Sequence, residues 1–283
     1  MKIIIAKDAG YCFGVRDAVN LAYDSTKKHG DVYMLGTIVH NERVVQDLSD
    51  AGTKVVKKLS EVPEDSPILF RAHGTANTVW DDADKRHMNI IDATCPLVRE
   101  IHDEVRKLAE ENRPVIVIGD HGHDEVVGIA SQVDNVIVVS TPKEAEGLRK
   151  MKRAGVVSQS TQTIENVQAI INVLMTKVYD LRFVNTICFP TKRNQAQIKE
   201  LANKCDVMII IGSFTSANSK RLEQLSKRIN SNTHQVNSTG ELKEEWFVNT
   251  DTVGISAGAS TPDYLIEEVR ERIESFSEIL QEV

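Results

Sequence analysis

Short apolar runs alternate with longer helical patterns along this chain of 283 residues. Three times, a run typical of a β-strand leads into a stretch with helical periodicity: 2–6 into 15–23, 89–94 into 97–111, and 182–187 into 195–204. Strands that alternate with helices predict parallel sheets covered by helices. We therefore expect an α/β fold.

A cysteine stands at each of these strand-to-helix transitions: Cys12, Cys95 and Cys188. A second landmark, a polar side chain after an apolar strand and a glycine, follows 28, 28 and 30 residues later, at His40, His123 and Asn218. A third landmark, a strand ending in small polar groups, follows 61, 65 and 72 residues after the cysteines, at His73, Ser160 and Ser260. Three landmarks in three units predict a diverged internal repeat.

The repeat predicts three α/β lobes, 1–88, 89–181 and 182–283, around a pseudo-threefold axis. The N-terminal strand, 2–6, could pack with a neighbouring lobe instead of its own. In open α/β sheets, ligands bind outside the carboxyl ends of the strands, which is where all nine landmarks lie. We expect the three cysteines to converge at the centre, with helix N-termini directed towards them.

Composition narrows the class of protein. The net charge of −7 argues against nucleic acid or a membrane surface as a partner. The apolar runs are too short for a transmembrane helix. The N-terminal apolar stretch is also too short, and charged residues follow it too early, for a signal peptide. We expect a cytoplasmic protein.

The cysteines are not in CxxC spacing, which argues against zinc ribbons and thioredoxin-like motifs. Three converging thiolates fit an iron–sulfur cluster with one open iron better than a structural zinc site, which usually has four ligands. Cys205 precedes the apolar run 207–211 and so belongs at the opposite end of a sheet. We interpret Cys205 as structural.

The remaining landmarks predict an anion site built from imidazoles, hydroxyls, an amide and helix N-termini. Its candidate members are His40, His73, His123, Ser216, Asn218 and Ser260. Neither GxxxxGK[ST] nor GxGxxG occurs, so no nucleotide site is predicted. Glu125 has two interpretations: a carboxylate favoured by the helix dipole, or a carboxyl kept protonated in a closed cavity as a proton donor.

Across essentially the whole chain, the sequence resembles the 4-hydroxy-3-methylbut-2-enyl diphosphate reductases, the LytB/IspH family. The resemblance rests on an ordered set of motifs: Gly10-Tyr11-Cys12-Phe13-Gly14-Val15, Val39-His40-Asn41, Ala72-His73-Gly74, Asp92-Ala93-Thr94-Cys95-Pro96-Leu97-Val98, Gly122-His123-Asp124-Glu125-Val126, Asn218-Ser219 and Ala257-Gly258-Ala259-Ser260. Each motif is weak alone, but the ordered set is highly specific.

The resemblance implies a [4Fe–4S] cluster on Cys12, Cys95 and Cys188, whose fourth iron receives the substrate hydroxyl. It implies that the anion site above holds the substrate diphosphate. Glu125 would supply protons through a hydroxyl where the family usually has threonine, here Ser160 or the adjacent Thr161. Ala217 stands where many members have serine, and its backbone N–H could serve there.

The implied reaction is the last step of the non-mevalonate isoprenoid pathway. Two electrons and two protons remove the allylic hydroxyl as water, through an allyl-like intermediate, and give isopentenyl or dimethylallyl diphosphate. Because the chain has no nicotinamide or flavin motif, the electrons are expected from a separate carrier such as ferredoxin or flavodoxin.

Two alternatives remain open. His121-Gly122-His123 resembles a paired metal ligand, which would suit a metal-dependent phosphohydrolase, although clustered aspartates beyond Asp120 and Asp124 are missing nearby. An iron–sulfur sensor would also use three cysteines, but it calls for a basic surface or a DNA-binding unit. Four other histidines, in turns or on charged helix faces, are expected to be solvated: His29, His87, His102 and His234.

Overall fold

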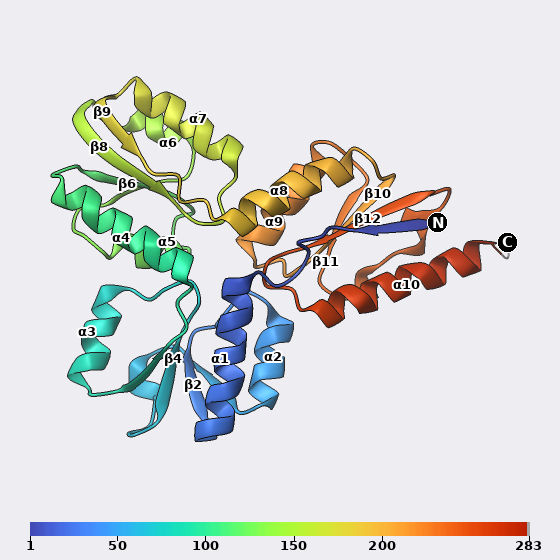
Figure 1. Cartoon of the computed structure of the whole chain (residues 1–283), viewed down its shortest axis with the longest axis horizontal. Coiled ribbons are helices and arrows are strands. Elements are labelled where there is room, and N and C mark those ends of the chain that lie inside the picture. Colours follow the sequence, from blue (N-terminus) through green and yellow to red (C-terminus); the bar gives the residue numbers. More distant parts are fainter. Residues whose placement is uncertain (282–283) are drawn as a thin grey trace. The chain divides into compact units, whose positions relative to one another are not determined.

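The computed structural model describes residues 1–281, which form three four-stranded sheets with helices packed against them (Figure 1). Every strand pair in these sheets is parallel. The predicted α/β fold with mainly parallel sheets is therefore confirmed. No helix in the described range is long and apolar enough to cross a membrane.

The N-terminal sheet has the order β3-β2-β4-β5. Its strands are β2 (Val32–Leu35), β3 (Thr53–Val56), β4 (Pro67–Phe70) and β5 (Asn89–Asp92). The helices of this part of the chain are α1 (Phe13–His29), α2 (Glu42–Asp50) and α3 (Asn77–Lys85), with a 3-10 turn at Leu59–Glu61. The core includes Ile68, Phe70 and Ala83, with Trp80 packed against Phe70.

The middle sheet has the order β7-β6-β8-β9. Its strands are β6 (Val115–Ile118), β7 (Ile137–Val139), β8 (Met151–Ser158) and β9 (Val178–Phe183). Its helices are α4 (Pro96–Glu110), α5 (Asp124–Ala130), α6 (Pro142–Gly147) and α7 (Ile164–Met175). Alternate β6 residues serve opposite cores: Ile116 and Ile118 join the cluster of α6 and α7, while Val115 and Val117 join that of α4 and α5. Burial on both faces explains why β6 is apolar throughout.

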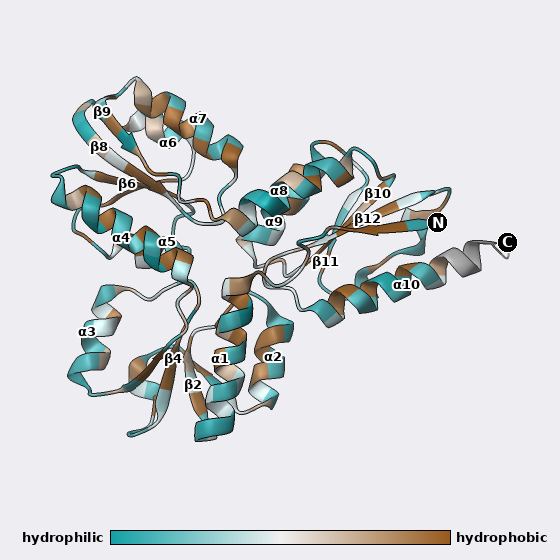
Figure 2. Ribbon diagram, viewed as in Figure 1, coloured by the Kyte–Doolittle hydropathy of each residue, from teal (hydrophilic) through white to brown (hydrophobic). Residues whose placement is uncertain are grey.

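The C-terminal sheet has the order β1-β12-β10-β11. Its strands are β1 (Lys2–Ile5), β10 (Val207–Ile211), β11 (Thr233–Val236) and β12 (Thr252–Ala257). Its helices are α8 (Phe189–Ala202), α9 (Ala217–Lys227) and α10 (Asp263–Gln281), with 3-10 turns at Thr239–Glu241 and Glu244–Phe247. Ile209 and Ile211 of β10 face the α10 core, and Met208 and Ile210 face the α8 and α9 core. Figure 2 shows the apolar strands between helices of mixed hydropathy.

The chain divides into two compact units. Unit 1 comprises Met1–Val15, His40–Val44 and Phe189–Val283, and it contains the C-terminal sheet. Unit 2 comprises Arg16–Val39 and Val45–Cys188, and it contains the N-terminal and middle sheets.

Two of the sheets contain a strand that comes from a different predicted lobe range. β1, at the start of the range 1–88, pairs with β12, and β5, at the start of 89–181, pairs with β4. The third β-run, expected over 182–187, forms β9 over Val178–Phe183 instead, where it pairs with β8. Ile3 and Ile4 of β1 pack into the two cores of the C-terminal sheet, which accounts for the pairing of this strand. The ranges 1–88, 89–181 and 182–283 stay a prediction.

Candidate functional site

The three repeat cysteines are anchored by equivalent backbone hydrogen bonds. Each cysteine N–H donates to a carbonyl at the third landmark of another repeat, in cyclic order: Cys12 to Ala259 beside Ser260 at 3.3 Å, Cys95 to Ala72 beside His73 at 3.0 Å, and Cys188 to Ser160 at 3.0 Å. Each cysteine also immediately precedes a helix, α1, α4 or α8. Because helix N-termini favour thiolates, the local structure suits all three as metal ligands. All three side chains are partly exposed.

In unit 2, Glu125 is joined to Ser160 by two hydrogen bonds. The Ser160 N–H donates to Glu125 Oε1 at 2.6 Å, and the Ser160 hydroxyl donates to Oε2 at 2.9 Å. Glu125 is 1% exposed, so both bonds lie out of water. Thr161 instead accepts a hydrogen bond from Gln159 Nε2 at 3.2 Å. Of the two candidate hydroxyls, the structure thus connects that of Ser160 to the carboxylate.

Two predicted histidines of unit 2 lie together. The rings of His73 and His123 have centroids 5.7 Å apart and meet edge to face. The Glu125 N–H donates to His123 Nδ1 at 3.1 Å, which caps α5. Since Nδ1 accepts, we assign the ring proton to Nε2, where it is a donor for an anion.

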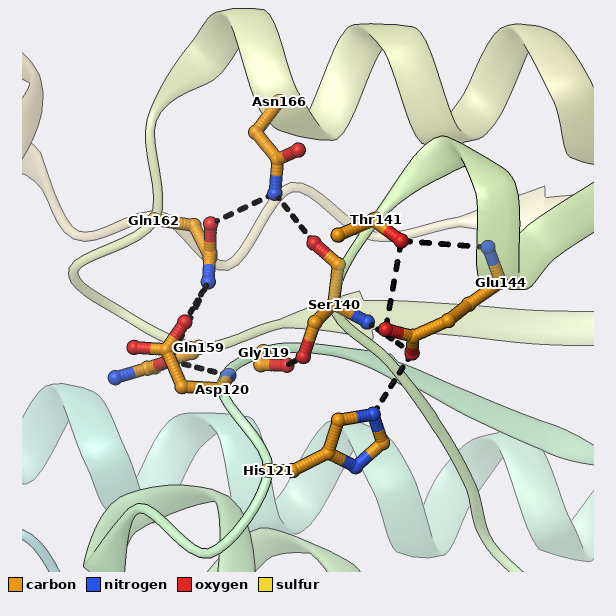
Figure 3. Close-up of polar contacts among 9 residues, drawn as sticks. All are labelled: Gly119, Asp120, His121, Ser140, Thr141, Glu144, Gln159, Gln162 and Asn166. Carbon is orange, nitrogen blue, oxygen red and sulfur yellow. Dashed lines mark hydrogen bonds and ion pairs between the residues drawn. The ribbon is translucent and has the colours of Figure 1, made fainter.

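A network of carboxamides links the loop 119–123, which leads into the helix of Glu125, with the loop 159–163, which contains Ser160 (Figure 3). The Asp120 N–H donates to Gln159 Oε1 at 3.1 Å, and Gln162 Nε2 donates to the same oxygen at 3.4 Å. Asn166 Nδ2 donates to Gln162 Oε1 and to the Ser140 carbonyl, each at 3.1 Å. Gln159 and Gln162 are 0% and 1% exposed, so this network holds the two loops in register where water cannot compete.

In unit 1, the predicted anion ligands occupy neighbouring loops. Ser216 caps α9 by accepting the Ser219 N–H at 3.3 Å, which leaves its hydroxyl proton available to donate. Ala217 is the first residue of α9, so its N–H is one of those without an intrahelical partner. The Ser260 hydroxyl donates to the His40 carbonyl at 3.2 Å and fixes the two segments together. Asn218 Nδ2 is buried and finds no hydrogen-bond partner in the range 1–281, as expected for a donor placed to receive a ligand oxygen.

Glu42 is a residue of this region that the sequence analysis missed. Its Oε1 accepts hydrogen bonds from the Ser213 hydroxyl at 2.8 Å and the Thr215 hydroxyl at 3.0 Å, and its Oε2 accepts one from Asn237 at 3.4 Å. Partial burial raises the pKa of Glu42, but these bonds and one from its own backbone amide together lower it. Its position directly after His40-Asn41 was the available signal, although its partners are far away in sequence.

Two predictions about the other histidines were wrong. His234 was expected to be solvated in a turn or on a charged helix face, but it lies in β11, is partly buried and stacks on the Trp246 ring with centroids 3.8 Å apart. His102 was expected on a solvated helix face, but it is only 8% exposed, against Gly74 and Gly128. The pKa of His102 is lowered to about 4, mainly because the ring is buried and secondarily because the positive charge of Arg106 is nearby. Gly74 has a φ of +84°, and a Cβ there would lie 3.0 Å from the His102 ring, so glycine suits this position twice over.

His121 does not join His123 as a paired ligand. His121 Nε2 contacts Glu144 Oε2 at 2.7 Å (Figure 3). His123 Nδ1 instead accepts the Glu125 N–H of its own helix. The contacts shown for the two rings are thus separate, and none of them supports the paired ligand of a metal-dependent phosphohydrolase. Cys205 is 6% exposed and lies two residues before β10, and burial raises the pKa of its thiol. The thiol of Cys205 is thus unlike those of the three cysteines at helix N-termini.

The donor chemistry fits an iron–sulfur cluster, because soft thiolate ligands select such clusters and three repeat-related thiols are held at helix N-termini. The chain is thus an α/β protein of parallel sheets whose strand ends carry these cysteines, a buried glutamate and the candidate anion ligands, a combination that suits redox chemistry on an anionic ligand.

Comparison with known proteins identifies the family. Residues 3–274 match the family model described as LytB protein. A protein of Geotalea uraniireducens described as 4-hydroxy-3-methylbut-2-enyl diphosphate reductase is 40% identical over 278 residues, 98% of each chain. A Geobacter metallireducens protein of the same description is 40% identical over 274 residues, 96% of this chain and 97% of the relative. The chain belongs to the LytB family.

Solved structures agree with this assignment. A structure described as (E)-4-hydroxy-3-methyl-but-2-enyl diphosphate reductase, the terminal enzyme of the non-mevalonate pathway, is 39% identical with a TM-score of 0.73, covering 97% of this chain and 99% of the other. The E-1-hydroxy-2-methyl-but-2-enyl-4-diphosphate reductase from Plasmodium falciparum is 26% identical with a TM-score of 0.91, covering 97% and 87%.

Proposed function

We infer that this chain reduces 4-hydroxy-3-methylbut-2-enyl diphosphate in the non-mevalonate isoprenoid pathway. Two electrons and two protons remove the allylic hydroxyl as water and give isopentenyl or dimethylallyl diphosphate. Full-length membership of the family is the observation that carries this inference, because relatives of this name align over 98% of the chain at 40% identity. The local chemistry of both units supports it.

Cys12, Cys95 and Cys188 would hold a [4Fe–4S] cluster. When bound, such a cluster supplies electrons and a Lewis-acidic iron that makes the hydroxyl a better leaving group. The equivalent backbone anchors of the three cysteines support this assignment, since they fix each thiol at the same place in its repeat. Cys205 would not be a ligand.

Unit 1 would supply much of the diphosphate site. The Ser216 hydroxyl and the buried Asn218 amide can donate to phosphate oxygens, and the first N–H groups of α9 add to them. Ser260 and His40 lie on segments already bonded to each other. His73 and His123 would complete the set. This combination binds an anion through directed hydrogen bonds, which explains how a chain of net charge −7 accepts a diphosphate.

Glu125 would be the proton source, with Ser160 as the relay. The Ser160 hydroxyl can pass its proton onward while taking another from Glu125, because hydroxyl and carboxyl oxygens are 2.9 Å apart. The backbone bond from Ser160 to Oε1 holds the carboxyl group in that orientation. The electrons would come from a separate carrier such as ferredoxin or flavodoxin.

The cluster assignment is tested by iron and acid-labile sulfide analysis of protein purified and reconstituted without oxygen. We expect about four iron and four sulfide per chain, as the [4Fe–4S] formula requires. Cys95→Ser should lower both counts, whereas the matched variant Cys205→Ser should leave them unchanged. A wild-type protein without sulfide, or iron loss in Cys205→Ser, would contradict the assignment.

The activity is tested by supplying this protein with a reduced viologen dye and the hydroxylated diphosphate. We expect substrate consumption and both five-carbon diphosphates as products. A protein that carries the full cluster yet consumes no substrate would instead favour the iron–sulfur sensor.

A further inference from the structure

Two phenylalanine rings lie stacked on the surface of unit 1. The rings of Phe13 and Phe189 have centroids 5.6 Å apart and are nearly parallel, at 8°. They are 38% and 50% exposed, although each ring offers a large apolar area that burial would stabilise. Contiguous exposed apolar groups of this kind mark interaction sites more often than single ones do.

Each ring belongs to the residue next to a proposed cluster ligand. Phe13 directly follows Cys12, and Phe189 directly follows Cys188, so each pair of Cα atoms is only about 3.8 Å apart. The stacked rings therefore bring the starts of α1 and α8 together at the surface. A partner that covers the rings would lie a few bonds from two of the three thiols.

The solvent side of α8, which begins at Phe189, is basic. Lys192 and Arg193 lie three and four residues after Phe189, on the same side of the helix. Lys199 lies further along the helix, and Lys204 lies two residues beyond its end. Glu200 is the acidic residue among them and pairs with Lys204, while Arg193 pairs with Asp8. This basic stretch contrasts with the net charge of −7 on the whole chain.

We propose that the stacked pair Phe13–Phe189 and the basic side of α8 form the docking surface for a small acidic protein that carries one electron. The proposal rests on the proposed function, which needs two electrons from outside the chain. Each docking event oxidises one reduced carrier by one electron, so two events supply the two electrons that one substrate consumes. Opposite charges speed the encounter, and the rings give the partner apolar contact beside the cluster ligands.

The test compares two electron donors in steady-state turnover by the reconstituted full-length protein. One donor is dithionite-reduced methyl viologen, and the other is a reduced acidic [2Fe–2S] ferredoxin. The variants are Phe189→Ser and Lys192→Glu, with Lys28→Glu, an exposed position in the last turn of α1, as the matched charge control. We expect both variants to lower kcat/KM for ferredoxin at least tenfold at low salt, with dye-driven turnover within twofold of wild type. Lys28→Glu should match wild type with both donors.

Calorimetric titration of oxidised ferredoxin into the protein gives a readout that does not depend on turnover. We expect the affinity for ferredoxin to fall as the salt concentration is raised. In Phe189→Ser and Lys192→Glu, the affinity should fall by the same factor as kcat/KM for ferredoxin. Equal ferredoxin kinetics and binding in wild type and both variants would overturn the docking surface, as would equal losses with dye and ferredoxin. If wild-type protein is inactive with the dye itself, the proposed function fails rather than the docking surface.

Discussion

Two equivalent loops of the repeat can be compared: one joins β6 to α5 in unit 2, and the other joins β10 to α9 in unit 1. Each loop follows a buried strand and a glycine, and each leads into a capped helix. In the first loop the cap is the His123 ring, and the next helical turn carries the buried Glu125. In the second loop the cap is the Ser216 hydroxyl, followed by the amide of Asn218.

Each loop is associated with a carboxylate, but the two carboxylates have different surroundings. Glu125 lies on the helix that follows its loop, α5, is 1% exposed and accepts two hydrogen bonds from Ser160. Glu42 is an exposed residue of α2, and its carboxylate accepts hydrogen bonds from the side chains of Ser213, Thr215 and Asn237. The same repeated loop is thus associated with a buried carboxyl, for which we propose a proton-donating role, and with an exposed carboxylate that accepts hydrogen bonds beside the proposed anion site.

The strongest test of this comparison is Glu125→Gln. We expect turnover to fall by about 10³-fold, within the usual range for loss of a general acid, because the amide keeps the shape but cannot give up a proton. Substrate binding, measured by calorimetry on the same protein, should be retained. Glu42→Gln should keep near-normal turnover as the matched control. Full turnover in Glu125→Gln would remove its role as a proton donor.

A second difference concerns acid stability in unit 2. The pKa of His102 is lowered from 6.5 to about 4, so the unfolded chain binds a proton before the folded chain does. Stability should therefore fall as the pH drops from 6.5 to 4, by about 3 kcal/mol in unfolding free energy. Denaturant titrations across this pH range should show a flatter dependence for His102→Leu. The exposed His29, changed to Gln, should leave the wild-type dependence intact, and a flattening there would contradict the assignment.

The relay itself is tested by a pair of neighbouring hydroxyls. We expect Ser160→Ala to lower kcat by about tenfold to 100-fold, because it removes the group through which the proton passes. Thr161→Val should change kcat less than threefold, since the Thr161 hydroxyl accepts a hydrogen bond from Gln159, whereas the Ser160 hydroxyl donates to Glu125. Single-turnover rates with a reduced cluster would separate this step from electron delivery. The reverse order of effects would assign the relay to Thr161.

The sequence predicted the parts of the site that depend on local pattern. Cys12, Cys95 and Cys188 are candidate ligands because a strand, a cysteine and a helix recur three times. The structure gives their backbones equivalent hydrogen bonds, and their role as ligands stays a prediction. Whether Ser160 or Thr161 meets Glu125 could not be predicted, because both are hydroxyls in one loop and only the backbone path decides which side chain faces α5.

Tertiary contacts explain what was missed. The burial of His102 depends on Gly74 and Gly128, which come from two other segments and leave room for an imidazole on an otherwise charged helix. Glu42 is bonded to residues 171, 173 and 195 positions away, a relation without any periodic signal. The pairing of β1 with β12 is likewise a contact between the two ends of the chain.

The smallest expected effect comes from Glu42, and it separates charge from hydrogen bonding. Glu42→Ala removes the acceptor that holds Ser213 and Thr215, the residues just before Ser216, so KM for the diphosphate should rise about fivefold, the equivalent of roughly 1 kcal/mol, with kcat nearly unchanged. Glu42→Gln keeps an acceptor oxygen for both hydroxyls and should restore KM.

Because the pKa of Glu42 is lowered in the folded protein, these bonds are fully present above its ordinary value of 4.5 and are lost as the pH falls through the folded value. The difference in KM between wild type and Glu42→Ala should therefore be constant near neutral pH. A KM that falls in Glu42→Ala would mean that repulsion between this carboxylate and the diphosphate outweighs the order it gives to the loop. Equal increases in the Ala and Gln variants would instead assign the effect to the charge of Glu42.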